Sequence, residues 1–322
     1  MFNIKPIVKE FELNGDFNIS RYSRSRINVI HIEISKDNIT GKGEAVPYKY
    51  IGEEICDLIS QFNFNNIDLD FDIIDNLEIS QSLKNGFVSA YLDWLAKSQN
   101  KNVWDILNID KPDNILTAYT LSLDSVDNMV KQACKNKDKP LLKLKLGDDN
   151  DIQRINAIRQ NCPDNRIIVD ANEGWNNNNI IKLLDCCDYN NVEMVEQPLP
   201  KGKDNILKDI NSSICICADE SFYDINDIQD LIGKYDAVNI KLDKTGGLIN
   251  ALKAFDIAKQ NNLKVVVGCM MGSSLAMAPA TLVAQNADWV DLDGSLWVKE
   301  DSEKLVIKNA SYIQTPESRL WG

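Results

Sequence analysis

Three acidic residues in the middle of the chain each end a short apolar run. They are Asp170, Glu196 and Asp219, at intervals of 26 and 23 residues. If they converge in the fold, their mutual repulsion calls for a cation among them. Oxygen ligands without histidine or thiolate favour Mg²⁺, with Mn²⁺ as the alternative, over Zn²⁺. Taken singly, each acid is more typical of a helix cap or a loop. The metal-site hypothesis therefore depends on all three acids ending apolar runs at similar spacing.

Lysines lie at matching positions before and after these acids. Lys143 and Lys145 are two residues apart in LLKLKLG, so on a strand their side chains share one face, and Lys241 ends VNIK. A lysine with the ordinary pKa of about 10.4 is a poor base at neutral pH, but a nearby ammonium group or metal cation lowers that pKa. We therefore expect amine bases on both sides of a metal ion. The alternatives are a solvated edge-strand pair and, for Lys241, a surface charge.

Further polar residues follow the last apolar runs. Asp291 and Asp293 in WVDLDGS share one face and could hold an ammonium group, a turn at the following glycine being the alternative. The segment GCMMGSS, with Cys269 and Met270, offers small side chains and backbone N–H groups to a ligand.

Three arginines stand close together near the N-terminus. Arg21, Arg24 and Arg26 in ISRYSRSRI could grip a carboxylate with two N–H groups. Alternating surface arginines are the simpler interpretation.

The spacing of these residues indicates the element that positions them. Eight candidate strands end 22 to 27 residues apart, at Thr120, Lys145, Asp170, Glu196, Asp219, Lys241, Gly268 and Asp291. Amphipathic stretches separate them, and the strands are near-continuous apolar runs, as in parallel sheets buried on both faces. Eight strands with seven intervening helices predict an α/β fold of the TIM-barrel type, whose strand ends surround one cavity.

The first third of the chain has a different texture. Residues 1 to about 50 predict strands in IKPIVKEFEL and INVIHIEIS, with a turn at NGD between them. From 53 to about 108 the apolar spacing becomes helical. We therefore expect an α+β domain over 1–113, completed by the tail 300–322, and the barrel over 114–299.

The overall composition excludes several classes of function. The 322 residues carry a formal charge of −13, which argues against a nucleic-acid partner. A single histidine, His31, leaves little material for a zinc site or a Ser-His-Asp triad. The eight cysteines lack paired metal-ligand spacing, and no apolar run suits a signal peptide or a membrane span. We expect a cytoplasmic protein with reduced thiols, and a homo-oligomer is compatible with the sequence.

At the residues above, the chain resembles the enolase superfamily in its muconate-lactonising subgroup, over essentially its whole length. The matching motifs are KLK (143–145), VDANEGW, VEQPLP, ADES, NIKLDKTGG and DLDG (291–294). Within the subgroup the chain is most similar to dipeptide epimerases of the L-Ala-D/L-Glu type, which bind the ammonium group of a dipeptide at a DLD motif.

The resemblance implies an α+β capping domain over a modified (β/α)7β barrel, with Mg²⁺ held by the three acids. It also implies that Lys145 and Lys241 are the acid/base pair and that Lys143 supports them. Thr120 would contact the substrate. Arg21, or alternatively Arg24, would grip the glutamate side chain, in a segment that resembles the family's mobile N-terminal loop.

The implied reaction is a 1,1-proton transfer at the α-carbon of the dipeptide's C-terminal residue. One lysine removes the proton, the other delivers one to the opposite face, and Mg²⁺ stabilises the enediolate. L-Ala-L-Glu and L-Ala-D-Glu are the expected substrates, and peptidoglycan recycling is the expected setting. The alternatives are o-succinylbenzoate synthesis, cycloisomerisation or N-acylamino acid racemisation, whose substrates lack an ammonium group for the Asp pair. A non-catalytic barrel that binds a small anion is the alternative of another class.

Overall fold

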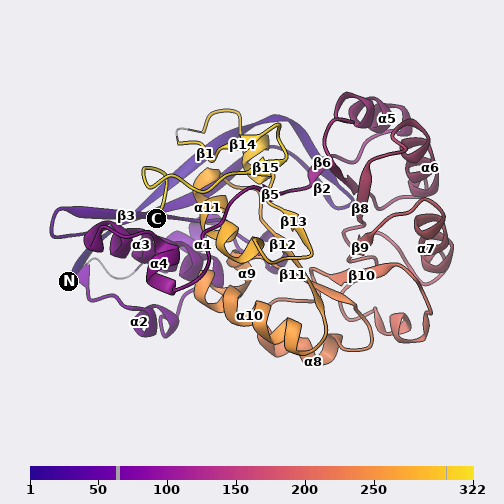
Figure 1. Cartoon of the computed structure of the whole chain (residues 1–322). Coiled ribbons are helices and arrows are strands. Elements are labelled where there is room, and N and C mark those ends of the chain that lie inside the picture. The colour runs from indigo at the N-terminus through magenta and orange to yellow at the C-terminus, as the bar shows by residue number, and fades with distance from the viewer. Residues whose placement is uncertain (63–65, 302) are drawn as a thin grey trace.

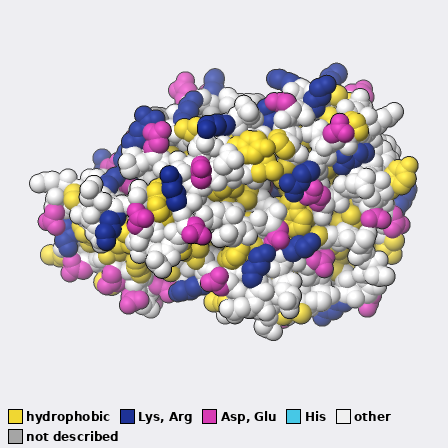
Figure 2. Space-filling model, in the orientation of Figure 1, with side chains coloured by type: hydrophobic (Ala, Val, Ile, Leu, Met, Phe, Trp, Pro, Cys, Tyr) yellow, Lys and Arg dark blue, Asp and Glu magenta, His cyan; other side chains and the backbone are white. Residues whose placement is uncertain are grey.

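The computed structural model describes residues 1–62, 66–301 and 303–322 (Figure 1). An antiparallel sheet and its helices lie at one end of the molecule, and a parallel barrel with its helices lies at the other. Within the described ranges, no helix has the length and apolar character needed to cross a membrane. Acidic and basic side chains are interspersed over the face shown in Figure 2, with hydrophobic side chains gathered near its middle.

The N-terminal sheet has four strands in the order β3-β2-β1-β4. Their bounds are Phe2–Ile19 (β1), Tyr22–Lys36 (β2), Ile39–Ala45 (β3) and Asn66–Ile67 (β4). The turn expected at NGD is wrong: β1 continues through these residues, and the pairing with β2 only shifts register between Glu12 and Phe17. Gly15, with φ of +113°, takes up the irregularity. The hairpin therefore turns at Ser20–Arg21, far enough along to reach the barrel (Figure 1).

Helices cover one face of this sheet. They are α1 (Ile55–Ser60), α2 (Phe71–Asp75), α3 (Gln81–Gln99) and α4 (Val103–Leu107), after the short 3₁₀ helix η1 (Lys49–Ile51). The long helix α3 packs directly on β3 because two glycines face it. A Cβ at Gly41 or Gly43 would lie 2.1 Å from a carbonyl oxygen of α3, so only glycine permits this approach.

The barrel expected from the strand spacing is confirmed. Eight parallel strands follow one another in the sheet in chain order. They are β6 (Tyr119–Leu121), β7 (Leu141–Lys145), β8 (Arg166–Asp170), β9 (Met194–Glu196), β10 (Cys215–Ala218), β11 (Ala237–Ile240), β12 (Lys264–Gly268) and β13 (Trp289–Asp291). The Ala118 N–H donates to the Val290 carbonyl at 2.8 Å, which brings the first and last strands together. Apolar side chains such as Ile168, Met194 and Val266 fill the interior.

The crossover segments are mostly helical. They include α5 (Val126–Lys135), α6 (Asp151–Asn161), α7 (Ile180–Tyr189), η3 (Ile225–Asp227) with α8 (Ile228–Leu231), α9 (Leu242–Thr245), α10 (Leu248–Gln260) and α11 (Ser274–Ala284). The 3₁₀ helix η4 (Gly294–Trp297) follows the last strand, β13. The crossover from β9 to β10 differs from expectation, since it carries only the 3₁₀ helix η2 (Asn205–Asp209). Its sequence QPLPKGK contains two prolines and a glycine, which disfavour a regular helix.

The C-terminal tail returns to the N-terminal part of the chain. Strands β14 (Ile307–Lys308) and β15 (Tyr312–Ile313) form a small sheet with β5 (Ile115–Leu116). The Trp321 indole N–H then donates to the Ser89 carbonyl of α3 at 2.9 Å. We propose the domain division expected from the sequence, with a capping domain over 1–113 completed by 300–322 and a barrel over 114–299.

Candidate active site

The three acids at the centre of the barrel lie on neighbouring strands. Asp170 and Glu196 end β8 and β9 and are direct partners in the sheet, and Asp219 follows β10. All three side chains are buried. The strand ends therefore bring the carboxylates to the same rim of the barrel, as the sequence predicts.

Each carboxylate accepts a hydrogen bond from a lysine ammonium group. The Lys143 Nζ lies 2.7 Å from a Glu196 oxygen and 3.1 Å from Asp170. The Lys145 Nζ lies 2.6 Å from Asp170, and the Lys241 Nζ lies 2.7 Å from Asp219. The lysines of β7 and the end of β11 thus surround the acids, with strands β8, β9 and β10 between them.

These contacts set the protonation of the cluster. Burial alone would lower the pKa of Lys143 and Lys241, but the neighbouring carboxylates raise both pKa values well above the usual range. Burial would raise the pKa of Asp170 and Asp219, yet the lysines lower both below their usual range. Among the protein's own groups, the carboxylates are the nearest charges of Lys143 and Lys241 and outweigh burial. The lowering of the lysine pKa values expected from a metal cation stays a prediction.

The fit of this cluster to a metal ion can be tested on the side chains themselves. Within the described part of the chain, no three His, Cys, Asp or Glu side chains form a group placed to hold a metal, since the carboxylates turn to the lysines. Burial and then the nearby Asp170 nevertheless raise the pKa of Glu196 to about 7, so the protein's own lysines do not fully compensate this carboxylate. The buried Oε2 of Glu220 and Oδ1 of Asn172 also have no partner there. This oxygen-only donor set suits a hard divalent cation, and ligation by the three acids stays a prediction.

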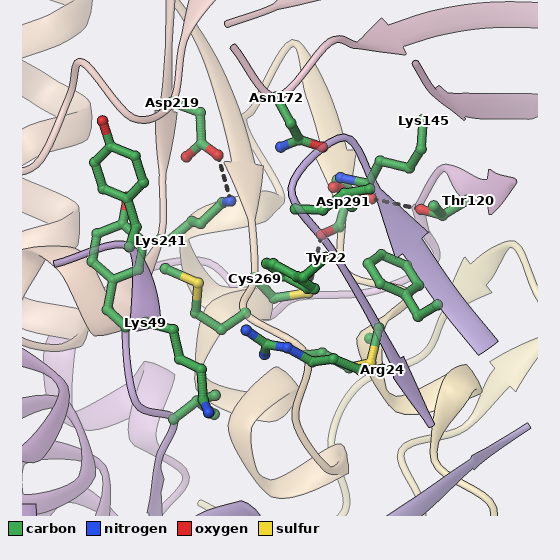
Figure 3. Close-up of a pocket in the computed structure, with 18 of the residues that line it drawn as sticks. Tyr22, Arg24, Lys49, Thr120, Lys145, Asn172, Asp219, Lys241, Cys269 and Asp291 are labelled. Atoms are coloured by element: carbon green, nitrogen blue, oxygen red, sulfur yellow. Dashed lines mark hydrogen bonds and ion pairs between the residues drawn. The ribbon is translucent and has the colours of Figure 1, made fainter. Parts of the chain in front are cut away.

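A cavity of about 350 Å³ opens above the cluster (Figure 3). Lys145 and Lys241 lie on different sides of it in the view, with Asp291 and Thr120 on the right and Arg24 and Lys49 below. Among the residues expected from the sequence, those that line it are Arg21, Arg24, Thr120, Lys145, Asp219, Lys241, Cys269, Met270, Asp291 and Asp293. Lys143, Asp170 and Glu196 lie beneath, in the buried cluster.

The Asp pair after β13 is part of the same wall. Asp291 is 2.6 Å from the Lys143 Nζ, and the Thr120 hydroxyl lies 3.5 Å from its other oxygen. Asp293 accepts a hydrogen bond from the Thr120 N–H at 2.7 Å. Burial and then the neighbouring Asp291 raise the pKa of Asp293 to about 7. The Cys269 thiol lies 3.3 Å from the Asp291 carbonyl, so the GCMMGSS segment packs against this pair.

The two arginines of the hairpin have different surroundings. Arg21, at the hairpin turn, is 2.7 Å from Glu173 and 2.6 Å from Glu220, and so ties the hairpin to the barrel rim. Arg24, on β2, stacks over the Tyr22 ring at 3.9 Å and makes no ion pair with any described residue. Arg24 therefore offers the cavity an uncompensated guanidinium group.

Three further residues contribute to the site and were not singled out in the sequence. Lys244, on α9, is fully buried and lies 2.7 Å from both the side chain and the carbonyl of Asp219. Asn239, two residues before Lys241, donates to Glu196 at 2.7 Å. Glu220 follows Asp219 directly. The alternation of strand side chains could have indicated Asn239, but no periodicity marks Lys244 or Glu220.

Comparison with known proteins agrees with this architecture. Residues 127–318 match the family described as Enolase C-terminal domain-like. The chain is 36% identical to the N-acetyl-D-glutamate racemase of a Pseudoalteromonas species, over 91% of this chain and 95% of that protein. It is 32% identical to the L-Ala-D/L-Glu epimerase of Escherichia coli K12, over 94% and 96% of the two chains.

Solved structures show the same relationship. An enolase family member from Agrobacterium tumefaciens, described as homologous to dipeptide epimerases and as holding sodium and L-Ala-L-Glu with an ordered loop, aligns over 100% of both chains. Its TM-score is 0.96 and its identity 38%. A dipeptide epimerase from Cytophaga hutchinsonii, complexed with Mg and D-Ala-L-Val, aligns with a TM-score of 0.88 and 26% identity over 98% and 94% of the chains. The chain therefore belongs to the enolase superfamily, among its epimerases and racemases.

Proposed function

We propose that this protein is a metal-dependent dipeptide epimerase that interconverts L-Ala-L-Glu and L-Ala-D-Glu. The observation that carries the proposal is the placement of Lys145 and Lys241, which line one cavity from strands on opposite sides of a carboxylate cluster. Inversion at a carbon atom requires a proton to leave one face and another to arrive at the opposite face. Two amines across a cavity meet this requirement. Recycling of cell-wall peptides in the cytoplasm is the setting that we propose with it.

The two lysines act as an acid and a base in turn. The unprotonated amine of one takes the α-proton of the glutamate residue, and the ammonium group of the other donates a proton to the opposite face. The pair ends with its protonation states exchanged, so the reverse reaction uses the same groups in the opposite roles. Lys143 would lie beneath the substrate, and its ammonium group offsets the charges of Glu196 and Asp291.

Asp170, Glu196 and Asp219 would hold the metal ion. A divalent cation there supplies positive charge next to the substrate carboxylate, where negative charge develops when the α-proton leaves. Mg²⁺ is the cation that we propose, because the donors are all oxygen and because dipeptide epimerases of the same fold contain it.

The remaining cavity residues define the two ends of the substrate. Asp291 and Asp293 would accept the dipeptide's ammonium group, with Thr120 beside them. Arg24 would hold the glutamate side chain, because its guanidinium group faces the cavity without an ion pair among the described residues. Arg21 is engaged with two carboxylates, which favours Arg24 over Arg21 for this role.

The test is proton NMR of L-Ala-L-Glu and of L-Ala-D-Glu in D₂O with the protein and Mg²⁺. We expect loss of the glutamate α-proton signal and growth of the other diastereomer, both abolished by EDTA and restored by excess Mg²⁺. A dipeptide with a neutral C-terminal residue, such as L-Ala-L-Met, serves as the matched substrate. Absence of exchange with every dipeptide would contradict the proposal.

A second candidate is racemisation of an N-acylated glutamate. Two observations favour it: the 36% identity to an N-acetyl-D-glutamate racemase, and an Asp293 carboxyl whose pKa of about 7 lets it donate a hydrogen bond to an acyl oxygen. The same NMR experiment with N-acetyl-L-glutamate distinguishes the two. Exchange of this compound at a rate above that of L-Ala-L-Glu would make racemisation the principal activity.

A further inference from the structure

The Glu196 carboxylate is held from two sides by groups of different charge. The Lys143 ammonium group lies 2.7 Å from Oε2, and the Asn239 amide donates to Oε1 at 2.7 Å. Lys143 also bonds to Asp291 and approaches Asp170, so its position is shared among three acids. In contrast, Glu196 is the one hydrogen-bond partner of the Asn239 side chain within the described residues. The amide is therefore devoted to this carboxylate.

The orientation of the Asn239 amide is fixed by its surroundings. The residue lies on β11, two positions before Lys241, and its side chain is completely buried. Its NH₂ group faces Glu196, because the reversed amide would place two oxygens against each other. Its own Oδ1 has no partner among the described residues. A buried acceptor without a partner lowers the free energy of unfolding by roughly 1–3 kcal/mol. The donor that Asn239 supplies to Glu196 therefore comes with a loss of stability.

A glycine on the next strand makes room for the amide. Gly268 lies on β12, which pairs with β11. A Cβ at Gly268 would lie 2.6 Å from the Asn239 Oδ1 and 2.8 Å from its Nδ2. Any other residue there would push the amide away from its present place. The position of the Asn239 donor thus depends on a second residue that touches no carboxylate of the cluster.

We propose that Asn239 is a positioning residue that fixes the Glu196 carboxylate for metal binding, and that Gly268 permits this by leaving space for the amide. The inference rests on the metal-dependent function proposed above and identifies residues that secure its metal site. A neutral donor is suited to this task because it orients a carboxylate without adding a positive charge that would repel the cation. Hydrogen bonds of this kind to metal ligands are worth about 10- to 100-fold in affinity.

The test is isothermal titration of MgCl₂ into the full-length protein, which needs no substrate. We compare the wild type with Asn239→Ala and with Asn165→Ala. Asn165 is the matched control. It is a buried amide that lies just before β8, at the end of the barrel opposite the cluster, and it donates to the carbonyls of Lys137 and Lys139. We expect Mg²⁺ affinity to fall 10- to 100-fold in Asn239→Ala and by less than twofold in Asn165→Ala.

A second variant guards against misfolding and tests the mechanism independently. Gly268→Ala substitutes neither Asn239 nor Glu196, but its Cβ displaces the Asn239 amide. The Mg²⁺ affinity of this variant should therefore also fall at least fivefold. In assays of both variants, the Mg²⁺ concentration for half-maximal activity should rise while kcat at saturating Mg²⁺ stays within about threefold. A change in kcat alone would contradict a positioning role.

The two proposals fail in different ways. Wild-type affinity for Mg²⁺ in folded Asn239→Ala, or in folded Gly268→Ala if the former does not fold, overturns the role of Asn239 and leaves the epimerase proposal intact. Absence of Mg²⁺ binding by the wild type overturns the metal-dependent function and this inference with it.

Discussion

Lys145 and Lys241 lie on strands that are four places apart in the eight-stranded barrel. Each is joined to a carboxylate of an adjacent strand end, Lys145 to Asp170 at 2.6 Å and Lys241 to Asp219 at 2.7 Å. The arrangement is close to symmetrical about Glu196, which lies on the strand midway between them. Each lysine thus contacts a carboxylate of a neighbouring strand end in the same way, as the proposed two-lysine scheme requires.

Removal of one of these lysines should therefore separate exchange from inversion. We expect Lys145→Ala and Lys241→Ala each to lower the rate of epimerisation by at least 10³-fold. Each variant retains one base, so each should still exchange the α-proton of a single diastereomer in D₂O, and the two variants should act on opposite diastereomers. Proton NMR of each pure diastereomer measures this. Lys253→Ala, at an exposed helical position, is the control, and full epimerisation by either site variant would refute the two-lysine scheme.

The division of labour between the arginines gives a test of specificity. Arg24→Met should lower kcat/KM for L-Ala-L-Glu by about 10- to 100-fold, because a hydrogen bond to a charged group contributes roughly 1.5–3 kcal/mol. The value for L-Ala-L-Met should change by less than threefold. Steady-state kinetics with both dipeptides provide the comparison.

Arg21→Met is the matched variant, since it removes the contacts with Glu173 and Glu220 that hold the hairpin on the barrel. Both dipeptides should then lose kcat/KM by the same factor. A selective loss of the glutamate substrate in Arg21→Met would reverse the assignment of the two arginines.

The barrel could be predicted from the sequence because its signal is local and repeated. Residues such as Asp170 and Lys241 end apolar runs at near-constant spacing, and a parallel barrel turns that spacing into proximity. The hairpin could not be predicted in the same way. Asn14–Asp16 has the composition of a turn, but the tertiary pairing of β1 with β2 continues past it as an irregularity. A local turn preference is small compared with the hydrogen bonds of a long antiparallel ladder.

Contacts between groups far apart in the chain could not be predicted from the sequence either. Nothing in the pattern of the DKTGG segment marks Lys244, which is fully buried against Asp219 and Phe222. The separation of Arg21 from Arg24 depends on Glu173 and Glu220, which lie some 150 and 200 residues away in the chain. Such pairings depend on both the strand order and the length of the hairpin. Neither of these can be predicted from the local sequence.

Asp293 predicts a pH dependence that differs between candidate substrates. Its pKa of about 7 means that the carboxylate is increasingly ionised as the pH rises from 6 to 8. A dipeptide's ammonium group, with a pKa of about 8, needs this negative charge and is still protonated up to pH 7, so the KM for L-Ala-L-Glu should fall between pH 6 and 7. The KM for N-acetyl-L-glutamate should stay level or rise. Asp293→Asn should remove this fall of the dipeptide KM between pH 6 and 7. If the fall is unchanged in the variant, a group other than Asp293 causes it.

Asp243 predicts how stability changes with pH. This buried carboxyl group of α9 accepts hydrogen bonds from the Val46 N–H and the Asn85 amide, both at 3.0 Å, and so joins α9 to the end of β3 and to α3. Burial raises its pKa to about 7 from an ordinary value of 3.8. A raised carboxyl pKa means that the folded state prefers the protonated form, so this group's contribution to stability falls as the pH rises from about 4 to 7. The loss amounts to as much as about 4 kcal/mol.

Asp243→Asn should keep both hydrogen bonds, because the amide oxygen accepts as the carboxyl did, and should be free of the ionisation cost. We therefore expect its Tm to exceed that of the wild type at pH 8 and to approach or fall below it at pH 5.

Asp288→Asn is the control, and its Tm at pH 8 should change in the opposite direction. The Asp288 carboxylate accepts from Lys259 and from the Val265 N–H, and its pKa is lowered, so this variant should lose stability at pH 8. Thermal unfolding of the three proteins at both pH values decides the matter. A Tm of Asp243→Asn that falls below the wild type by the same amount at pH 5 and pH 8 would show that the Asp243 carboxyl remains ionised across this range.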